Sequence, residues 1–487
     1  MPDTPTILLN GTPTKLLGAP PNTTLLDWLR GSASTGMGGT GMGGLIGTKE
    51  GCAEGDCGAC TIALEQIEAG RVVTRAANAC MLLLGQLDGL SVRTIEGLAA
   101  PDGTAHPVQQ AYVDEGGTQC GFCTPGFVMA THAHLASGGG TAEADIHDAL
   151  AGNLCRCTGY RSIVAAVARA ATLPAAPLPT TALPTPALAS LRRPTDADFG
   201  DFLAPRSLSA ALALRAAHPD AALLAGGTDL GLLASRARTP PARVIHLAHV
   251  PELTTIGTTP TGLRIGAAVP YSDALPALTA LHPALRPYLT RIGSVQIRNL
   301  GGIGGNLGTA SPIGDSHPVL LALDARIELA SAARGPRTVP IDAFFTGYRT
   351  TALAPDEIIT AIELPTPPPG AVLFAEKISK RRDQDISTVA AACLIGLDQG
   401  RVTTIRLAYG GVAATPVRAR HAEAALLGKP LDASSIAAAI AALPADIAPL
   451  SDWRGSAAYR MRLAGNLLRR LHLRLTAPHL SLEVDAL

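Results

Sequence analysis

Cysteine is the residue type through which this sequence most clearly points to chemistry. Eight of its nine cysteines form two groups of four, namely Cys52, Cys57, Cys60 and Cys80, and then Cys120, Cys123, Cys155 and Cys157. Thiolates are soft ligands that bind zinc, copper and iron–sulfur clusters. We expect no signal peptide, because the first residues are not basic and no apolar segment follows them. Two four-thiolate groups in such a chain predict bound metal.

The first group has the Cys-x4-Cys-x2-Cys spacing of plant-type [2Fe-2S] ferredoxins, with Cys80 as a fourth cysteine farther along. The run from Gly51 to Cys60 contains three glycines, which allow the positive φ angles that a tight loop around a cluster requires. Their amides can point at the sulfurs and raise the reduction potential. Zinc sites usually show paired Cys-x2-Cys knuckles, and disulfides suit small secreted chains. We therefore favour iron and sulfide over zinc and disulfides here.

Short strands at residues 6–9, 61–64 and 72–74 and a helix at 24–29 are expected around this loop. They predict a small ferredoxin-like domain. The second cysteine group has helical surroundings, with predicted helices at 107–115, 124–136 (capped by Thr124), 141–150 (capped by Thr141) and from about 160 to before Pro174. The cysteines then lie at helix beginnings, where free amides favour an anionic cluster. On spacing alone, zinc stays an alternative for this group.

Residues 171–191 contain no charge, but five prolines exclude a membrane helix and predict an extended linker. A second unusual stretch is the Gly/Ser/Thr-rich segment 31–44. It includes a Gly-x-Gly-x-x-Gly match at 39–44 that follows a helix rather than a strand, so we interpret it as an insertion without a nucleotide. The 39 basic and 39 acidic residues balance, and no basic patch predicts binding to nucleic acid or to a membrane.

Four cysteine-bearing runs resemble the iron–sulfur portion of xanthine dehydrogenases and related molybdenum hydroxylases. They are GTKEGC at 47–52, GDCGAC at 55–60, QCGFCTPG at 119–126 and CRCTGY at 155–160. The resemblance implies that both groups of four cysteines hold [2Fe-2S] clusters. It also implies that Cys157 and Gln119 face the molybdopterin of a partner.

Glycine-rich loops follow the linker, at 223–230 and 301–315. Bare glycine backbone lets amides cradle a pyrophosphate, and a nearby Asp can bind ribose or ring hydroxyls, although glycine clusters also form ordinary turns. Neither loop has the Rossmann or phosphate-loop pattern. Both are similar to the FAD domain of the same family, as are QIRN at 296–299 and KISKRRDQDI at 377–386, although Gly302 stands where many members have Ser or Thr. By this resemblance the FAD-contact residues are Leu223, Leu224, Ala225, Gly226, Gly227, Thr228, Asp229, Leu230, Ile292, Gly302, Gly305, Asn306, Asp315, Ile359 and Lys377. A surface ion pair is the alternative for Lys377 and Asp315.

Three histidines and the ninth cysteine stand outside these motifs. We expect structural or exposed roles for His132, His134 and His317, and a buried apolar role for Cys393. The tail resembles the C-terminal flavoprotein domain of the family. The predicted fold is therefore a multidomain α+β chain: a β-grasp ferredoxin-like domain (1–96), a four-helix [2Fe-2S] domain (97–172), the linker (173–192), a vanillyl-alcohol-oxidase-like FAD domain (193–369) and an α/β C-terminal flavoprotein domain (370–487).

In function, the architecture resembles the small subunit of bacterial xanthine dehydrogenases. That resemblance implies a large molybdopterin-binding partner, a dimer of heterodimers, NAD+ as acceptor and a cytoplasmic location. No nicotinamide motif is visible in the sequence, so oxygen, ferredoxin or a quinone are alternative acceptors. Substrate chemistry is expected on the partner, which hydroxylates a purine, while this chain passes electrons through both clusters to FAD. An equivalent subunit acting with an aldehyde or N-heterocycle hydroxylase, or a stand-alone flavin–iron–sulfur reductase, are the alternatives.

Overall fold

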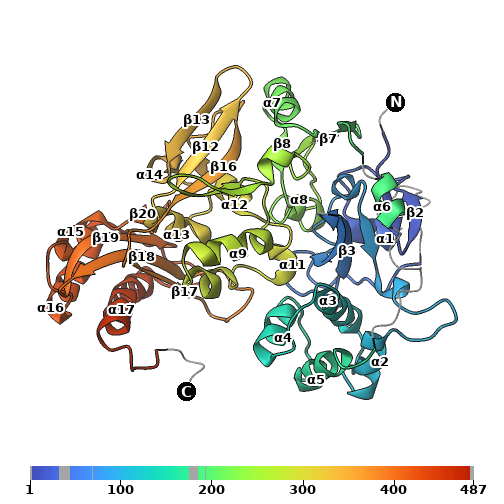
Figure 1. The fold of residues 1–487 in the computed structure, drawn as a ribbon, viewed down its shortest axis with the longest axis horizontal. Coiled ribbons are helices and arrows are strands. Elements are labelled where there is room, and N and C mark those ends of the chain that lie inside the picture. The colour runs from blue at the N-terminus through green and yellow to red at the C-terminus, as the bar shows by residue number, and fades with distance from the viewer. Residues whose placement is uncertain (1–2, 32–43, 69, 175–184, 192, 483–487) are drawn as a thin grey trace. The chain divides into compact units, whose positions relative to one another are not determined.

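The computed structural model describes residues 3–31, 44–68, 70–174, 185–191 and 193–482 (Figure 1). The chain divides into two units. The first comprises Met1–Pro251 with Gly293–Gly301, and the second comprises Glu252–Ile292 with Gly302–Leu487. The boundary falls inside the predicted FAD domain, and the domain limits predicted from the sequence stay predictions. The Gly-x-Gly-x-x-Gly match and most of the segment 31–44 lie outside the described residues.

A mixed five-stranded sheet begins the first unit. Its order is β2 (Thr12–Lys15), β1 (Thr6–Leu9), β5 (Ser91–Arg93), β3 (Thr61–Glu68) and β4 (Arg71–Asn78). Only β1 and β5 pair in parallel, and the other neighbours are antiparallel. Helix α1 (Leu25–Leu29) starts at Thr24, whose hydroxyl accepts the Asp27 amide, and its leucines pack on the sheet. The expected strands and helix are present, and β3 and β4 are longer than the pattern predicted.

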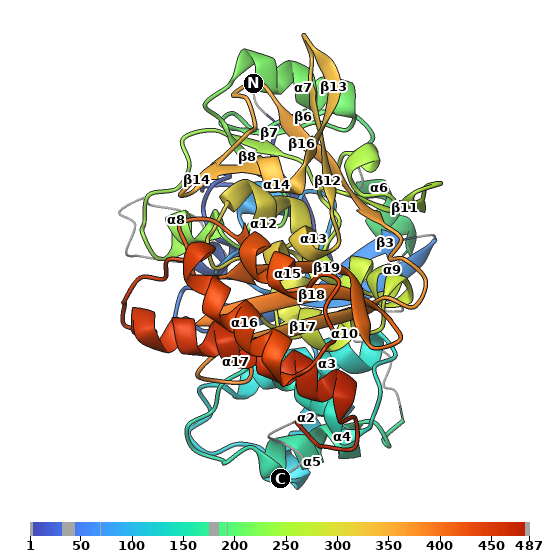
Figure 2. The same ribbon diagram turned by 90° about the vertical axis from the view of Figure 1, so that its left-hand side faces the viewer.

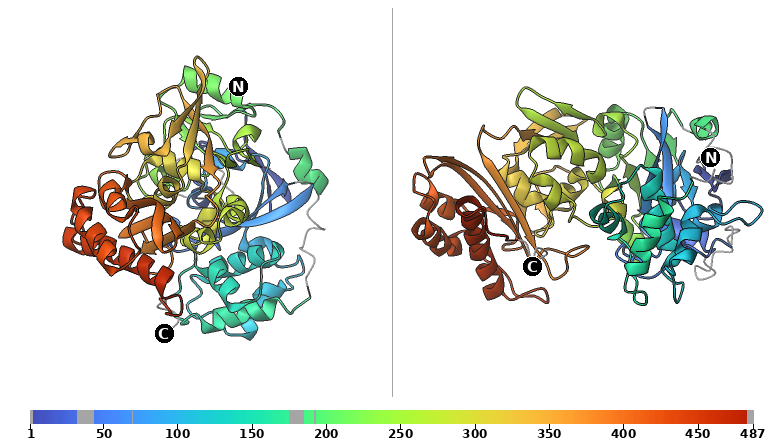
Figure 3. Two further views of the ribbon diagram at one scale, coloured as in Figure 1. Left: turned by 60° about the vertical axis from the view of Figure 1, so that its left-hand side comes forward. Right: turned by 60° about the horizontal axis from the view of Figure 1, so that its bottom comes forward.

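Four helices follow, namely α2 (Pro107–Asp114), α3 (Thr124–Ala136), α4 (Glu143–Leu150) and α5 (Arg161–Ala170). Figure 3 shows this group of helices beside the first sheet, and α3 packs against β3 and β4. The predicted caps are wrong at two starts. Cys123 precedes α3 because the Thr124 hydroxyl bonds Thr118 instead of the helix amides. Ala142, with extended backbone angles, precedes α4.

The predicted linker is wrong in part, because Thr185–Leu191 form helix α6. Pro186 occupies its second position, where a missing amide costs no intrahelical bond. Leu188 is buried, and α6 packs against β1 and β3. Residues 175–184 lie outside the described part of the chain.

A second small sheet completes the first unit. Its order is β6 (Ala197–Asp198), β7 (Phe202–Ala204), β9 (Val244–His246) and β8 (Ala222–Leu224), and the last three strands are parallel. Helix α7 (Leu208–Ala217) connects β7 to β8, and α8 (Gly231–Ser235) connects β8 to β9. Helix α11 (Val295–Arg298), capped by Ser294, also belongs to this unit.

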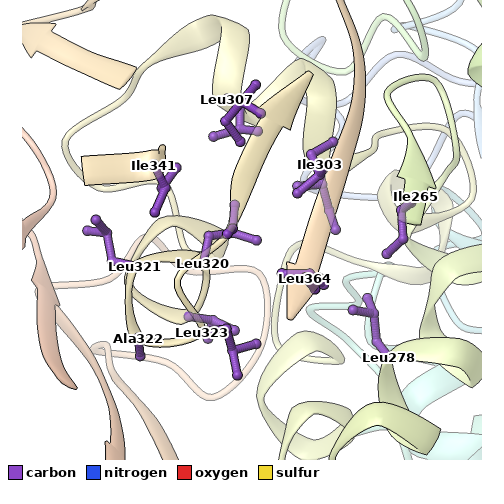
Figure 4. Close-up of a cluster of buried hydrophobic side chains, with 14 of the residues drawn as sticks. Ile265, Leu278, Ile303, Leu307, Leu320, Leu321, Ala322, Leu323, Ile341 and Leu364 are labelled. Carbon is purple, nitrogen blue, oxygen red and sulfur yellow. The ribbon is translucent and has the colours of Figure 1, made fainter. Parts of the chain in front are cut away.

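The second unit contains an antiparallel sheet. Its order is β10 (Ile256–Thr258), β11 (Gly262–Gly266), β16 (Ile358–Pro365), β12 (Arg326–Ser331) and β13 (Gly335–Pro340). The helices and short strands around it are α9 (Tyr271–Leu281), α10 (Leu285–Leu289), α12 (Ile303–Thr309), α13 (Ser316–Ala322), α14 (Ile341–Phe344), β14 (Phe345–Gly347) and β15 (Thr350–Thr351). Figure 4 shows their shared core, which contains Ile303 and Leu307 of α12, residues of α13 such as Leu320, and the strand residues Ile265 and Leu364. The core holds α12 and α13 in place.

Another sheet, β17 (Val372–Ile378), β18 (Val389–Asp398), β19 (Arg401–Gly410) and β20 (Val417–Arg418), forms the C-terminal part of this unit. Helices α15 (Arg420–Leu426), α16 (Ala433–Ala442) and α17 (Ala457–Thr476) cover one face of it (Figure 2). Cys393 is fully buried in β18, as expected. The predicted fold class, a multidomain α+β chain, is confirmed. No helix among the described residues is long and apolar enough to cross a membrane.

Candidate functional sites

The first four cysteines converge at one end of the first sheet. Cys52, Cys57 and Cys60 come from the loop that leads into β3, and Cys80 follows β4. The Cys52 and Cys57 side chains are hydrogen-bonded to each other, and those of Cys60 and Cys80 likewise. Cys60 and Cys80 are buried, whereas Cys52 and Cys57 are half-buried. The structure therefore gathers the four sulfurs that the spacing singled out.

Backbone amides point at this sulfur group. The amides of Glu54, Asp56 and Cys57 donate to Cys52 Sγ over 3.3–3.4 Å. The hydrogen bonds from Cys57 and Asp56 lower the pKa of Cys52 to about 6. Pairing with Cys60 and burial raise the pKa of the Cys80 thiol. Donors aimed at sulfur stabilise negative charge there, so this loop fits an anionic iron–sulfur cluster.

The second four cysteines also pair. Cys120 bonds Cys157, and Cys123 at the start of α3 bonds Cys155. The amides of Cys157 and Thr158 donate to Cys155 Sγ over 3.4 and 3.5 Å. Cys120 and Cys157 are exposed, whereas burial and the neighbouring Cys155 raise the pKa of Cys123 to about 12. This group is therefore the more accessible one.

None of the nine cysteines forms a disulfide, so the disulfide alternative is wrong. Among the described residues, no three or more His, Cys, Asp or Glu side chains form a site for a single metal ion. That finding does not bear on an iron–sulfur cluster, because its four thiolates bind two separate irons. The donors present, four thiolates with amides directed at them, fit such a cluster in both groups.

The two cysteine loops touch each other. The Leu154 amide donates to the Cys57 carbonyl over 3.0 Å, and Asn153 Nδ2 donates to the Gly58 carbonyl over 3.0 Å. Lys49 Nζ lies 5.8 Å from the ring centre of Phe122. The residues that hold one sulfur group thus contact those that hold the other.

Helix α3 packs closely on the first cysteine loop, so one methyl group added at this contact should lower the stability of the fold. A Cβ at Gly126 would lie 2.2 Å from the Gly58 carbonyl oxygen. We expect Gly126→Ala to destabilise the protein by about 1–3 kcal/mol despite the better helix propensity of alanine. Urea unfolding measures this. Gly257→Ala is the control, because nothing lies within 4 Å of its added Cβ. Equal effects of both substitutions would show that the two loops are not packed this way.

Two buried histidines, His132 and His317, are packed against other protein groups. His132 in α3 contacts His106 edge-on, with ring centres 5.2 Å apart. His317 Nε2 lies 3.1 Å from the Asn306 carbonyl, and burial lowers its pKa to about 4. His134 bonds the Gly140 carbonyl. These contacts agree with the roles expected from the sequence.

The burial of His132 predicts a pH dependence. Burial and the charges of His106 and Arg93 lower its pKa to about 3, whereas an unfolded histidine titrates near pH 6.5. Below pH 6.5 the unfolded chain binds a proton that the folded chain does not, so stability falls as the pH falls towards 3. We expect a loss of about 1 kcal/mol over the first pH unit below 6.5. Urea unfolding of His132→Gln should show a flatter pH profile than the parent, and parallel profiles would contradict the prediction.

The predicted FAD-contact residues of the first unit, Leu223–Leu230, begin in β8 and end before α8. Gly227 has a positive φ of +78°, so the chain can turn there. A Cβ on Gly226 would lie 1.8 Å from the Leu300 carbonyl oxygen. Glycine at 226 is thus required by the approach of this chain's own backbone, and its contact with a pyrophosphate stays a prediction.

The other predicted FAD-contact residues belong to the second unit. Gly302 precedes α12, which contains Gly305 and Asn306; Ile359 lies in β16. The predicted loop 301–315 is therefore helical between Ile303 and Thr309. A Cβ on Gly302 would lie 2.2 Å from the Val269 carbonyl oxygen, so a side chain there would collide with this chain's own backbone. Gly305, by contrast, faces open space.

Lys377 and Asp315 form a buried ion pair, so the surface alternative is wrong. Lys377 Nζ lies 2.6 Å from Asp315 Oδ2, and their side chains are 2% and 11% exposed. Ser387 donates to Asp315 Oδ1 over 2.5 Å, and Lys377 also donates to the Arg291 carbonyl over 3.1 Å. Ile292 follows Arg291. A contact of Asp315 with the flavin would use the carboxylate lone pairs that Lys377 and Ser387 do not occupy.

Several residues of these networks were not predicted from the sequence. Gln296 lies within a motif run, Asn153 lies two residues before another and Ser387 follows a third, but no local signal shows which groups they bond. Their partners are far away in the chain. Only the folded structure brings them together.

Three protein-family models match the chain. They are the "[2Fe-2S] binding domain" over residues 94–168, the "FAD binding domain in molybdopterin dehydrogenase" over 197–367 and the "CO dehydrogenase flavoprotein C-terminal domain" over 374–475. Among curated proteins, xanthine dehydrogenase from Emericella nidulans is 33% identical over 96% of this chain. The chain spans 38% of the length of that relative.

Solved structures give a similar result. A chain of carbon monoxide dehydrogenase from Hydrogenophaga pseudoflava is 34% identical with a TM-score of 0.53, and the match covers 55% of this chain and 94% of that one. A chain of quinoline 2-oxidoreductase from Pseudomonas putida 86 is 30% identical with a TM-score of 0.52, covering 56% and 94%. The chain belongs to the molybdenum hydroxylase family. Within it, the chain has the [2Fe-2S] and FAD domains, which confirms the resemblance of the motifs and the predicted [2Fe-2S] and FAD cofactors.

Proposed function

We propose that this chain is the electron-transfer subunit of a xanthine dehydrogenase. It receives electrons from the molybdenum cofactor of a large partner subunit and passes them through two [2Fe-2S] clusters to FAD and then to NAD+. The iron–sulfur clusters supply single-electron steps, and the flavin joins them to a two-electron acceptor. The assembly is a dimer of heterodimers in the cytoplasm, and substrate chemistry takes place on the partner.

One observation carries the proposal. A xanthine dehydrogenase aligns with 96% of this chain, across both cysteine groups and the flavin domains, and the structure links the two cysteine loops through Leu154, Asn153, Cys57 and Gly58. Contact between the loops keeps the two sulfur groups close, which electron transfer between them requires. The exposure of Cys120 and Cys157 supports the second group as the one that meets the partner.

In this proposal the protein groups hold the cofactors and set their environment. The eight paired cysteines are the iron ligands. Amides directed at Cys52 and Cys155 stabilise negative charge on the sulfurs. The predicted FAD-contact residues, among them Leu223–Leu230 and Lys377, hold the flavin.

Co-purification with metal analysis tests the proposal. Affinity-tagged chain from its native host should bring down a large subunit with molybdenum, and the complex should reduce NAD+ when xanthine is added. An active preparation without a large partner and without molybdenum would refute the subunit assignment. It would favour the stand-alone flavin–iron–sulfur reductase.

A second candidate function retains the molybdenum-containing partner subunit but assigns that partner a different substrate. Its support is the similarity to carbon monoxide dehydrogenase and quinoline 2-oxidoreductase, at 34% and 30% identity. The same co-purified complex separates these candidates when it is assayed with xanthine, an aldehyde and an N-heterocycle. Turnover of quinoline-type substrates with none of xanthine would favour an N-heterocycle hydroxylase.

A further inference from the structure

The peptide between Gly58 and Ala59 lies inside the first cysteine loop and is unusually well bonded. The Gly58 carbonyl accepts three hydrogen bonds: from the Thr61 amide over 3.0 Å, the Thr61 hydroxyl over 2.7 Å and Asn153 Nδ2 over 3.0 Å. The Cys52 side chain and burial raise the pKa of the Cys57 thiol, whereas a hydrogen bond from the Ala59 amide, at the other end of the same peptide, lowers it. The peptide therefore connects a set of donors to one sulfur of the group.

Gln296 helps to determine to which acceptor the Thr61 hydroxyl donates its proton. Its Nε2 donates to Asn153 Oδ1 over 2.8 Å and to Thr61 Oγ1 over 3.2 Å, and Asn153 Nδ2 donates to Thr61 Oγ1 over 3.3 Å. A hydroxyl has two acceptor lone pairs and one proton. Since both lone pairs of Thr61 are used, its proton goes to the Gly58 carbonyl. Gln296, Thr61 and Asn153 are 0%, 2% and 3% exposed, so water does not compete for these bonds.

Hydrogen bonds in a chain polarise one another, and this effect is stronger in a buried site. Donors at the Gly58 carbonyl therefore strengthen the Ala59 amide as a donor to Cys57. A stronger bond to the sulfur stabilises the reduced, more negative form of an iron–sulfur cluster.

We propose that Thr61, Asn153 and Gln296 raise the reduction potential of the cluster held by the first cysteine group, through the Gly58–Ala59 peptide. They are positioning residues, since none of them touches the cluster. The inference deepens the proposed electron relay, and of that function it requires only the first [2Fe-2S] cluster. The three residues come from the ferredoxin-like sheet, the second cysteine domain and the flavin-domain motif. The potential of the first cluster thus depends on contacts from all three.

A redox titration of the purified full-length chain, followed by electron paramagnetic resonance, tests the proposal without partner or substrate. Thr61→Val should make the first cluster about threefold harder to reduce, a shift of about 28 mV to more negative potential. Gln296→Leu should shift it in the same direction, because the Thr61 proton is then free to point elsewhere. The second cluster should keep its potential, and Thr61→Ser should restore that of the first.

The matched control is Thr131→Val. Thr131 is another buried threonine of the first unit, and its hydroxyl bonds Tyr112 over 2.9 Å, away from the Gly58 carbonyl. It should leave the first cluster unchanged. An unshifted first cluster in both Thr61→Val and Gln296→Leu would overturn the proposal, as would equal shifts of both clusters. If both variants lost the first cluster, the network would hold the loop rather than tune it, which also overturns the proposal. A parent chain without iron–sulfur signals would instead contradict the cofactor assignment.

Discussion

Cys80→Ala is expected to remove the first cluster and leave the second intact. Cys80 is 1% exposed and hydrogen-bonded to Cys60, so its sulfur lies within the first group although it is distant in sequence. Alanine supplies no ligand, and three thiolates leave one iron without its full set. Iron and acid-labile sulfide should fall by about half, and one of two paramagnetic signals should disappear. Cys157→Ala should remove the other signal.

The ninth cysteine provides the matched control. Cys393 is fully buried in β18 of the other unit, and burial raises the pKa of its thiol, so it is inert. Cys393→Ala should retain all iron and both signals. If Cys80→Ala also kept its full iron content, the fourth ligand of the first cluster would have to be another residue.

The sequence predicted the cysteine groups well because their chemistry is local. Three ligands of the first group lie within one loop, and the motif specifies the glycines and amides around it. Helix α3 was likewise predicted with the correct limits, although its cap was not, because Thr124 bonds Thr118 rather than the helix amides. A short side chain that bonds another side chain nearby, here six residues away, does not follow the local rule for caps.

The linker shows a different limit. Prolines at five positions predicted an extended segment, but a proline at the start of a helix costs little, and burial of Leu188 favours helix α6.

The role of single glycines was also ambiguous in the sequence. Gly226 and Gly302 were assigned to flavin contacts, whereas the structure shows that a side chain there would collide with this chain's own backbone. Sequence pattern identifies such a glycine but not the group that approaches it.

The buried pair of Lys377 and Asp315 predicts the largest loss of stability. In Lys377→Met the Asp315 carboxylate keeps, among the described residues, only the hydroxyl of Ser387 as a side-chain donor, and the Arg291 carbonyl loses the ammonium. Removing one partner of a buried pair costs about 3–5 kcal/mol. We expect a loss of this size in urea unfolding, together with lower FAD content after gel filtration. Asp356→Asn, in the exposed pair with Arg334, is the control and should change neither quantity measurably.

The double variant separates support of the fold from support of the flavin. Lys377→Met combined with Asp315→Leu leaves no buried charge unpaired, so it should be more stable than Lys377→Met alone. If the two side chains hold FAD, the double variant should nevertheless stay depleted of flavin, because apolar groups cannot replace the lost hydrogen bonds. Full flavin content in the stabilised double variant would mean that the pair serves only the fold. In that case the assignment of Lys377 and Asp315 as flavin contacts would be wrong, while the ion pair itself would still explain why both residues are buried together.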